Sequence, residues 1–428
     1  MKTESIGIIT MGCPKNMVDS EKIAAAIRKA GLNVEHEDAE AKIILINTCA
    51  FINDAKEESI NEILFHVERK KNDENVKVFV FGCMAQRYKD ELKKEIPEVD
   101  GYFNFDEVNK LIELLTKDKT MPEIDRVLST PTHYAYLKIS EGCNRTCSFC
   151  AIPKIRGKMV SVPEEKLLEE AKMLAEKGVK ELIIIAQDTV SYGIDIYGEK
   201  RIAKLLNKVS KIDGIEWIRL MYTYPAGFPG DLIDEIASNP KILKYIDIPL
   251  QHINSDILKS MNRAIDKEGV ELLIEKLRKK IPNLAIRSTF IVGYPGEKAK
   301  DFLELANFIK KARFERFGVF AYSPEEDTPA FVLPDNVSAK VKMKRMSDLL
   351  QIHEKINIEQ NNLLIGKKIE VIIDDFSEDE KCFLGRTSSD APEIDNIVII
   401  YTSKKLNIGD IVSVKVTSIG VFEIICEY

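Results

Sequence analysis

The run Glu141-Gly-Cys-Asn-Arg-Thr-Cys-Ser-Phe-Cys150 places three cysteines, Cys143, Cys147 and Cys150, on one short loop. Three thiolates can hold three irons of a 4Fe–4S cube and leave the fourth iron without a protein ligand. An open iron can take up a substrate or a cofactor, so this spacing indicates chemistry more than structure. A zinc knuckle is the alternative. It is disfavoured because structural zinc needs four closed ligands and no second cysteine pair follows.

The composition is typical of a soluble globular protein. The 428 residues are 45% hydrophobic and 31% charged, a length that predicts two or three domains. No apolar run is long enough to span a membrane, and the N-terminus lacks the apolar segment of a signal peptide, so we expect a cytoplasmic location. Eight cysteines in a reducing compartment suit metal binding better than disulfides, and the net charge of −7 argues against a surface that binds nucleic acid throughout.

Residues 1–125 form the first predicted domain, in which short apolar strands alternate with charged helical stretches. Three predicted strands each run into a cysteine: residues 5–10 before Cys13, residues 42–46 before Cys49 and residues 76–81 before Cys83. This alternation predicts an open parallel α/β sheet, whose ligands bind beyond the carboxyl ends of the strands. One such cysteine alone could be a packing residue. Three at equivalent positions favour a second metal site.

Residues 130–337 form the second predicted domain, with six apolar strands separated by helical segments. The predicted strands are residues 134–139, 181–186, 217–221, 245–248, 285–291 and 317–322. Repeated βα units predict a TIM-like (βα)6 barrel or part-barrel with its functional site at the C-terminal face. The loop that carries Cys143 follows the first of these strands, and it therefore lies on that face.

Residues 338–362 have the pattern of one amphipathic connecting helix that leads out of the barrel, and residues 363–428 then change to β-branched runs between Gly and Asp turns. These runs predict a small all-β barrel, in which Cys382 and Cys426 are expected to be packing residues. From Ile365 onward the chain has seven Lys or Arg and twelve Asp or Glu. An RNA-binding module should be basic, so this balance favours a basic protein partner, with solvated acidic turns as the alternative interpretation.

The Cys-x3-Cys-x2-Cys spacing after the first barrel strand, with Phe149 before the last cysteine, resembles the radical S-adenosylmethionine superfamily. Together with the three-cysteine domain and a TRAM-like terminal barrel, it makes essentially the whole chain similar to the methylthiotransferases. Five motifs resemble the RimO branch of that family: Gly12-Cys-Pro-Lys-Asn16, Thr48-Cys-Ala-Phe51, Ala186-Gln-Asp-Thr189, Ser191-Tyr-Gly193 and Pro249-Leu-Gln-His252. That branch modifies an aspartate of protein twelve of the small ribosomal subunit. The sister branch modifies an adenosine of transfer RNA and typically carries a different residue pair after the first cysteine.

The resemblance implies two 4Fe–4S clusters, with S-adenosylmethionine as both methyl donor and radical source. The radical-generating cluster would be held by Cys143, Cys147 and Cys150. An auxiliary cluster, whose open iron can take up sulfide or polysulfide, would be held by Cys13, Cys49 and Cys83. The expected reaction places a methylthio group on the β-carbon of the target aspartate. The alternatives are a transfer RNA methylthiotransferase of the same fold and a non-catalytic metal protein.

The implied partners are a basic small-subunit ribosomal protein or the assembled subunit, a low-potential electron donor such as a flavodoxin or ferredoxin, and a source of sulfide or polysulfide. Neither a membrane nor direct nucleic-acid binding is expected.

Further cofactor contacts are expected at Phe149 and at two barrel strand ends. Gln187 and Asp188 follow the second barrel strand, where the superfamily contacts the methionyl part of the cofactor. Gly293 and Glu297, in Gly293-Tyr-Pro-Gly-Glu297, could approach the adenosine, with a plain strand-to-helix turn as the alternative.

Two further positions are interpreted differently. Gln251 and His252 end the fourth barrel strand, and we interpret His252 as a hydrogen-bonded structural residue rather than a ligand. The chain has Ser161-Val162 where the family usually has serine followed by arginine, so a family arginine contact would be absent.

Overall fold

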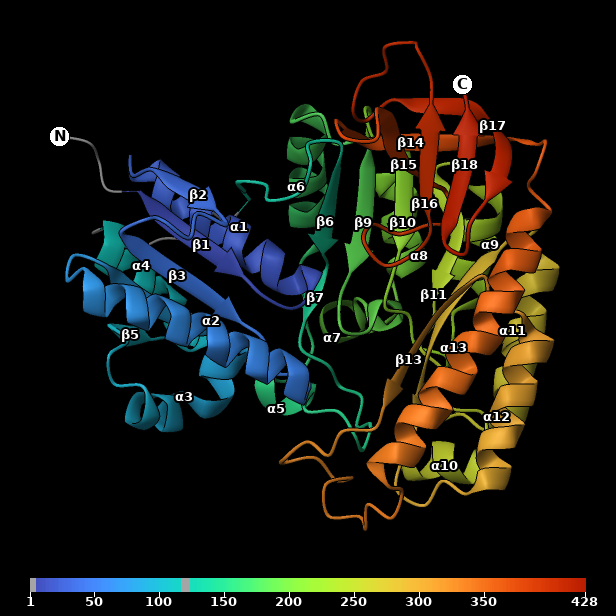
Figure 1. Ribbon diagram of the computed structural model, residues 1–428, viewed down its shortest axis with the longest axis horizontal. Helices are drawn as coiled ribbons and strands as arrows, with labels where there is room; N and C mark the ends of the chain where they lie inside the picture. The colour runs from blue at the N-terminus through green and yellow to red at the C-terminus, as the bar shows by residue number, and fades with distance from the viewer. Residues whose placement is uncertain (1–4, 117–123) are drawn as a thin grey trace.

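A five-stranded parallel sheet forms the N-terminal part of the computed structural model, which describes residues 5–116 and 124–428 (Figure 1). In the order β2-β1-β3-β4-β5, its strands are β2 (Val34–His36), β1 (Ile6–Thr10), β3 (Ile43–Thr48), β4 (Lys77–Gly82) and β5 (Gly101–Tyr102). The helical elements that accompany it are α1 (Pro14–Lys29), α2 (Asn53–Asn72), α3 (Cys83–Glu95), η1 (Phe105–Glu107) and α4 (Val108–Thr116). The predicted open parallel α/β sheet is confirmed. The edge strands β2 and β5 are too short to give a sequence pattern.

Six parallel strands form the central part-barrel in the order β13-β12-β11-β10-β9-β6, which confirms the predicted barrel class. They are β13 (Arg316–Ala321), β12 (Ala285–Val292), β11 (Ile242–Asp247), β10 (Trp217–Leu220), β9 (Glu181–Ile185) and β6 (Tyr134–Lys138). Its longer helices are α6 (Glu164–Glu176), α8 (Ile202–Val209), α9 (Gly230–Ser238), α11 (Lys267–Lys280) and α12 (Ala299–Ala312). The connecting loops contain β7 (Ser140–Glu141), α5 (Ile152–Ile155), β8 (Val160–Ser161), η2 (Thr189–Ser191), α7 (Ile194–Tyr197) and α10 (Ser255–Ser260).

Alternation along each barrel strand separates two cores. Leu182 and Ile184 of β9 pack in the large core with the surrounding helices, whereas Ile183 and Ile185 pack with the tyrosines of β6 in a second cluster. This period of two is expected when both faces of a strand are buried against different layers.

A long helix, α13 (Ala339–Asn362), packs against α12 and β13 before the chain enters a closed barrel (Figure 1). The barrel order is β14-β15-β16-β18-β17, with β14 (Lys368–Ser377), β15 (Cys382–Thr387), β16 (Ile397–Tyr401), β18 (Glu423–Glu427) and β17 (Ile411–Ile419). The predicted all-β barrel is confirmed, and Cys382 and Cys426 are buried in it. The β-branched runs of the sequence, residues 369–373, 397–401, 411–416 and 421–425, predict four of these strands and miss β15, because Gly385 interrupts its pattern. A Cβ at Gly385 would lie 2.4 Å from the Ile372 carbonyl oxygen, so the close approach of β14 explains the glycine.

The strands of the two parallel sheets run toward the space between them, so their carboxyl ends converge there (Figure 1). The closed barrel lies at the opposite end, against the beginnings of the part-barrel strands. Glu181 and Arg316, the first residues of β9 and β13, both contact it. The domain boundaries that the sequence suggests stay predictions. Within the described ranges, no helix is long and apolar enough to cross a membrane.

Buried ion pairs join the closed barrel to the part-barrel. Glu181 is fully buried; its Oε1 accepts a hydrogen bond from Arg219 Nε at 2.7 Å, and its Oε2 lies 2.8 Å from Arg386 Nη1. Arg386 also donates to Asp374 Oδ2 at 2.7 Å. Arg219 belongs to β10 and Arg386 to β15, so this carboxylate bridges the two parts of the chain.

Some acidic residues of the closed barrel pair across this interface, so the count made from the sequence overstates the negative charge of its surface. Asp390 pairs with Arg316 at 2.6 Å, and Asp395 with Arg287 at 3.3 Å. The exposed charged residues are nearly balanced. The acidic ones are Glu370, Asp375, Glu378, Asp379, Glu380, Glu393 and Glu427, and the basic ones are Lys367, Lys368, Lys381, Lys404, Lys405 and Lys415. The net charge of this segment therefore does not identify its partner.

Replacing Glu181 with Gln should destabilise the protein, because two buried guanidinium groups lose their shared carboxylate. We expect the free energy of unfolding to fall by about 3–5 kcal/mol, the cost of breaking a buried ion pair. Urea denaturation, monitored by circular dichroism, measures this change in the free energy of unfolding. Glu378→Gln is the control, because Glu378 pairs with Lys381 on the surface and should cost less than about 1 kcal/mol. Equal effects of the two substitutions would contradict the bridging role.

Candidate functional site

The first cysteine triplet, Cys143, Cys147 and Cys150, follows β6 and β7 at the carboxyl end of the part-barrel. Burial raises the pKa of the Cys150 thiol to about 12, and Cys147 and Cys143 add to the rise, which places the three sulfurs close together. Burial also raises the pKa of Cys143 to about 11. Thiols of this kind are deprotonated by metal binding, so the donor set suits a metal better than a free nucleophile.

The backbone of this loop is set by Gly142. Its φ is +75°, and a Cβ there would lie 2.2 Å from the Lys158 carbonyl oxygen. Cys143 N donates to the Gly157 carbonyl at 3.1 Å, so the chain after the triplet folds back across its start. Only glycine fits both the positive φ and the close approach.

Two arginines and a tyrosine surround the triplet. Arg263 Nη1 lies 3.3 Å from Cys147 Sγ, and its guanidinium stacks 4.3 Å from the ring centroid of Tyr224. Arg145, inside the triplet loop, stacks on the same ring at 3.9 Å. The positive charges of Arg263 and Arg145 would partly neutralise the negative charge of a thiolate-bound cluster.

The second triplet is brought together from three separate strand ends. Cys13 follows β1, Cys49 follows β3 and Cys83 begins α3 directly after β4. Burial raises the pKa of Cys83 to about 12, Arg156 opposes the rise, and Cys13 and Cys49 add to it. A Cβ at Gly12 would lie 2.8 Å from Cys49 Sγ, so the glycine makes room for that sulfur. The three cysteines converge at one edge of the sheet, as their positions in the sequence indicate.

Arg156 connects the two triplet regions. Its Nη2 donates to Asn16 Oδ1 at 2.5 Å and lies 3.5 Å from Cys83 Sγ, while its Nη1 contacts Asp19 Oδ2 at 2.8 Å and Glu141 Oε2 at 3.0 Å. Glu141 begins the first triplet loop. One buried guanidinium therefore holds the N-terminal sheet against the loop of the part-barrel.

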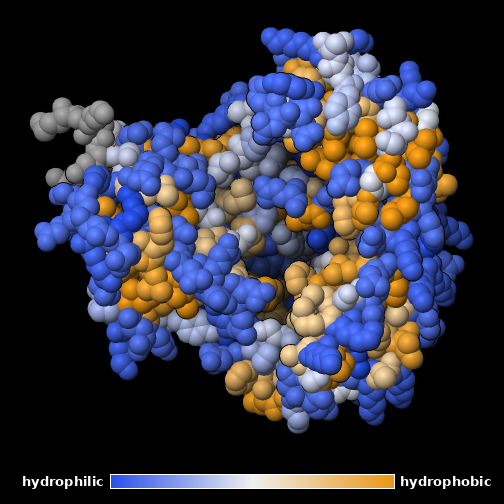
Figure 2. Space-filling view, viewed as in Figure 1, coloured by the Kyte–Doolittle hydropathy of each residue, from blue (hydrophilic) through white to orange (hydrophobic). Residues whose placement is uncertain are grey.

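A deep hollow opens between the N-terminal sheet and the part-barrel (Figure 2). The carboxyl ends of both sheets, which carry the two triplets, point toward this region (Figure 1). The segment after β13 closes one side of it, because Glu325 pairs with Lys56 at 2.9 Å and with Arg87 at 3.1 Å. Substrate access is thus framed by both parts of the chain.

Gln187 and Asp188 lie beside the first triplet, where the sequence predicts cofactor contacts. Gln187 Nε2 donates to Glu141 Oε1 at 2.7 Å, and Asp188 Oδ2 accepts from Arg145 Nε at 2.7 Å. Gln187 Oε1 and Asp188 Oδ1 are buried and have no hydrogen-bond partner in the described structure. Buried polar atoms are normally hydrogen-bonded, so these two oxygens indicate that a polar group of a ligand binds beside them.

Glu297 is bound within its own turn and to α13. Its Oε2 accepts from Gly293 N at 2.5 Å, and its Oε1 accepts from Arg345 Nη1 at 2.8 Å. A Cβ at Gly293 would lie 2.3 Å from Lys342 Cγ, so this glycine also packs on α13. The geometry gives both residues a structural use, and their predicted contact with adenosine stays a prediction.

The remaining predicted positions have packing or structural roles. Phe149 packs between the main core and a small cluster that contains Tyr294. His252 is fully buried, burial lowers its pKa to about 4, and its Nδ1 accepts from Asn254 N at 3.0 Å, which agrees with a structural interpretation. Gln251 N bonds to the Thr289 carbonyl at 2.8 Å. Val162 packs against the main core, where an arginine would be poorly accommodated.

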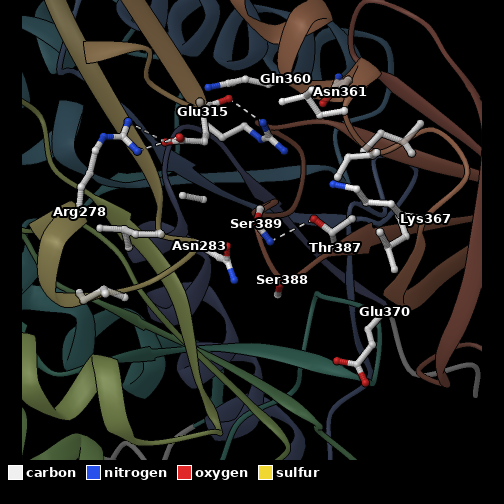
Figure 3. A pocket seen from close by; sticks show the side chains of 18 residues that line it. Arg278, Asn283, Glu315, Gln360, Asn361, Lys367, Glu370, Thr387, Ser388 and Ser389 are labelled. Carbon is white, nitrogen blue, oxygen red and sulfur yellow. Dashed lines mark hydrogen bonds and ion pairs between the residues drawn. The ribbon is translucent and has the colours of Figure 1, made fainter. Parts of the chain in front are cut away.

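In the described part of the chain, no group of three or more His, Cys, Asp or Glu side chains, the two triplets included, is arranged to hold a single metal ion. A cavity of about 560 Å³ lies between α13, the start of β13 and the closed barrel (Figure 3). Its Arg278 and Glu315 pair with each other at 2.9 Å, and no cysteine lines it.

Comparison with known proteins adds the family. Residues 137–309 match the radical SAM superfamily, residues 5–104 match the uncharacterized protein family UPF0004, and residues 365–428 match the TRAM domain. The chain is 47% identical to a ribosomal protein uS12 methylthiotransferase RimO of Caldanaerobacter subterraneus, over 99% of this chain and 100% of that protein. It is 46% identical to the Aquifex aeolicus protein of the same name, over 98% and 96% of the two chains. The chain belongs to the RimO family of radical SAM methylthiotransferases.

A solved structure shares the fold at low sequence identity. The radical S-adenosylmethionine methyltransferase TsrM from Kitasatospora setae matches with a TM-score of 0.54 and 14% identity, over 77% of this chain and 75% of that one. RimO membership makes the protein a radical SAM methylthiotransferase and implies S-adenosylmethionine and a 4Fe–4S cluster. The first triplet fits this requirement, because it supplies two buried cysteines and one half-buried cysteine beside the unpartnered oxygens of Gln187 and Asp188.

Sequence reasoning missed the arginines of the site. Arg263 is 116 residues from Cys147, and no local pattern connects the two. Arg156 lies close to the first triplet in the sequence, but its contacts with Asn16 and Cys83 depend on the packing of two domains.

Replacing Gly142 with Ala should prevent the first triplet from holding iron, because its Cβ would overlap the Lys158 carbonyl. Gly157→Ala is a matched control, since Gly157 has the same φ of +75° and nothing within 4 Å of its Cβ. We expect Gly142→Ala to lose about four irons per chain and Gly157→Ala to retain them, measured by iron analysis after anaerobic reconstitution. Equal iron in both variants would contradict the steric role.

Proposed function

We propose that this protein methylthiolates the β-carbon of an aspartate in ribosomal protein uS12, using two 4Fe–4S clusters and S-adenosylmethionine. The grouping of one cysteine triplet at the carboxyl end of each parallel sheet, with both ends directed toward the space between the sheets, supports the proposal most directly (Figure 1). The close relatives are named for action on uS12. A cytoplasmic location, where the ribosomal target is found, is part of the proposal.

The first triplet, Cys143, Cys147 and Cys150, would hold the radical-generating cluster, and Cys13, Cys49 and Cys83 would hold the auxiliary one. When bound, S-adenosylmethionine and the clusters supply a methyl group, a 5′-deoxyadenosyl radical and a position for the sulfur. A radical is required because the target β-carbon is not acidic enough for removal of its hydrogen as a proton by a general base. The sulfur is drawn from sulfide or polysulfide, and the electron from a flavodoxin or ferredoxin.

The chain's own residues position these reactants. Gln187 Oε1 and Asp188 Oδ1 are available to the cofactor, while Glu141 and Arg145 hold the other ends of those two side chains. Arg156 fixes the distance between the triplets through Cys83 and Glu141. Such fixed placement lowers the entropic cost of bringing three reactants together. Phe149, Gly293 and Glu297 remain proposed cofactor neighbours.

The substrate assay separates uS12 from transfer RNA. The reconstituted protein is incubated anaerobically with S-adenosylmethionine, sulfide, a reductant and either a uS12 peptide containing the aspartate or unmodified transfer RNA. We expect mass spectrometry to find the methylthio group on the peptide aspartate. Modification of adenosine alone would refute the proposed target, and stoichiometric zinc without iron would refute the enzyme.

Replacing one cysteine should abolish different parts of the reaction, depending on the triplet to which it belongs. Cys147→Ala should abolish both 5′-deoxyadenosine formation and methylthio transfer, because no radical forms. Cys49→Ala should keep 5′-deoxyadenosine formation and about half of the roughly eight irons per chain, yet lose methylthio transfer. Cys382→Ala is the control, since this cysteine is buried in the closed barrel. Full methylthio transfer by Cys49→Ala would contradict the proposed role of an auxiliary cluster in the reaction.

A further inference from the structure

Lys15 is a buried cation that has no carboxylate partner among the described residues. It is the second residue of α1, and only 8% of its surface is exposed. No carboxylate in the described structure forms an ion pair with it, and its Nζ lies instead 3.2 Å from the ring centroid of Tyr222. A buried charge is costly unless it is paired, so stability alone does not account for this lysine.

The carboxylates near Lys15 are engaged elsewhere. Asp19 pairs with Lys138 and Arg156, and Glu141 pairs with the same two cations. Asp247, at the end of β11, accepts from Tyr222 N at 3.0 Å and contacts Arg287 at 3.4 Å. Arg156 therefore has protein anions around it, whereas Lys15 does not.

Lys15 lies beside the second cysteine triplet, and Tyr222 connects it to the strand end next to the first triplet. It follows Cys13 by two residues, and the Tyr222 ring beneath it lies near both Lys15 and Cys13, since both affect the phenol electrostatically. The Tyr222 carbonyl accepts from Thr189 N at 3.1 Å, immediately after Gln187 and Asp188. Tyr222 has a φ of +56°, a strained conformation for a non-glycine residue of the kind found at functional sites.

We propose that Lys15, supported on the Tyr222 ring, binds the side-chain carboxylate of the substrate aspartate and so holds its β-carbon between the two triplets. This inference rests on the proposed function. The side-chain carboxylate of aspartate is bonded directly to the reacting β-carbon, so an anchored carboxylate leaves that carbon little freedom. A buried ammonium also selects aspartate over asparagine, because a neutral amide leaves the cation unpaired.

The test compares Lys15→Gln and Lys15→Arg with wild type on two peptides, one with the target aspartate and one with asparagine in its place. Lys29→Gln is the control, because Lys29 lies exposed in the last turn of the same helix. We expect Lys15→Gln to raise the KM for the aspartate peptide about 10- to 100-fold, the range of one charged hydrogen bond. Its preference for aspartate over asparagine should fall, and Lys15→Arg should restore part of both.

Iron content and 5′-deoxyadenosine formation without peptide should remain at the wild-type level in Lys15→Gln. An unchanged KM would overturn the proposal, and a loss of turnover at saturating peptide with unchanged KM would instead assign Lys15 to a sulfur anion near Cys13. Loss of iron in both Lys15 variants would make the residue structural and also overturn it. Failure of the wild-type protein to modify the peptide would refute the proposed function, whereas wild-type activity with an unaffected variant refutes only the role of Lys15.

Discussion

The contact of Arg156 with both cysteine regions is the constraint on which the site depends. Its guanidinium is buried and reaches Asn16 and Cys83 on one side and Glu141 on the other. A planar group with five donors can satisfy several acceptors at fixed angles, which a lysine could not do. Other ion pairs also join the two parts, among them Lys138 with Asp19 and Glu325 with Arg87, but Arg156 is the one that contacts a cysteine of the second triplet and the loop of the first.

A second set of buried charges fixes the opposite end of the part-barrel. Glu181, Arg219 and Arg386 close the beginnings of the strands against the terminal β-barrel. The terminal barrel therefore covers the beginnings of the part-barrel strands and leaves their carboxyl ends, which carry the cysteine loop, accessible. Asp390 and Asp395 of the terminal barrel pair with arginines of the part-barrel, so net charge counted along the sequence overstates the acidity of the surface. The count cannot separate buried from exposed carboxylates.

Patterns of consecutive residues predicted the positions of the cysteines, because those positions depend on the order of strands and helices along the chain. The strand-end positions of Cys13, Cys49 and Cys83 follow from strand–helix alternation, and their convergence follows from a parallel sheet. The Cys143 loop is contiguous, so its spacing is visible directly. The sequence pattern did not predict strands β2, β5 and β15, because the first two are very short and Gly385 interrupts the third.

The sequence by itself determined the three-part fold, the two triplets and the family, because motif spacing and periodicity are properties of consecutive residues. Only the tertiary structure decided which charges are paired. It assigned Glu297 to Arg345, gave Arg156 to both triplet regions and left Lys15 without a carboxylate from the described residues. Those outcomes depend on side chains from separate elements meeting at specific distances, such as Glu297 and Arg345, 48 residues apart, or Arg156 and Cys83, 73 residues apart, and no local pattern contains that information.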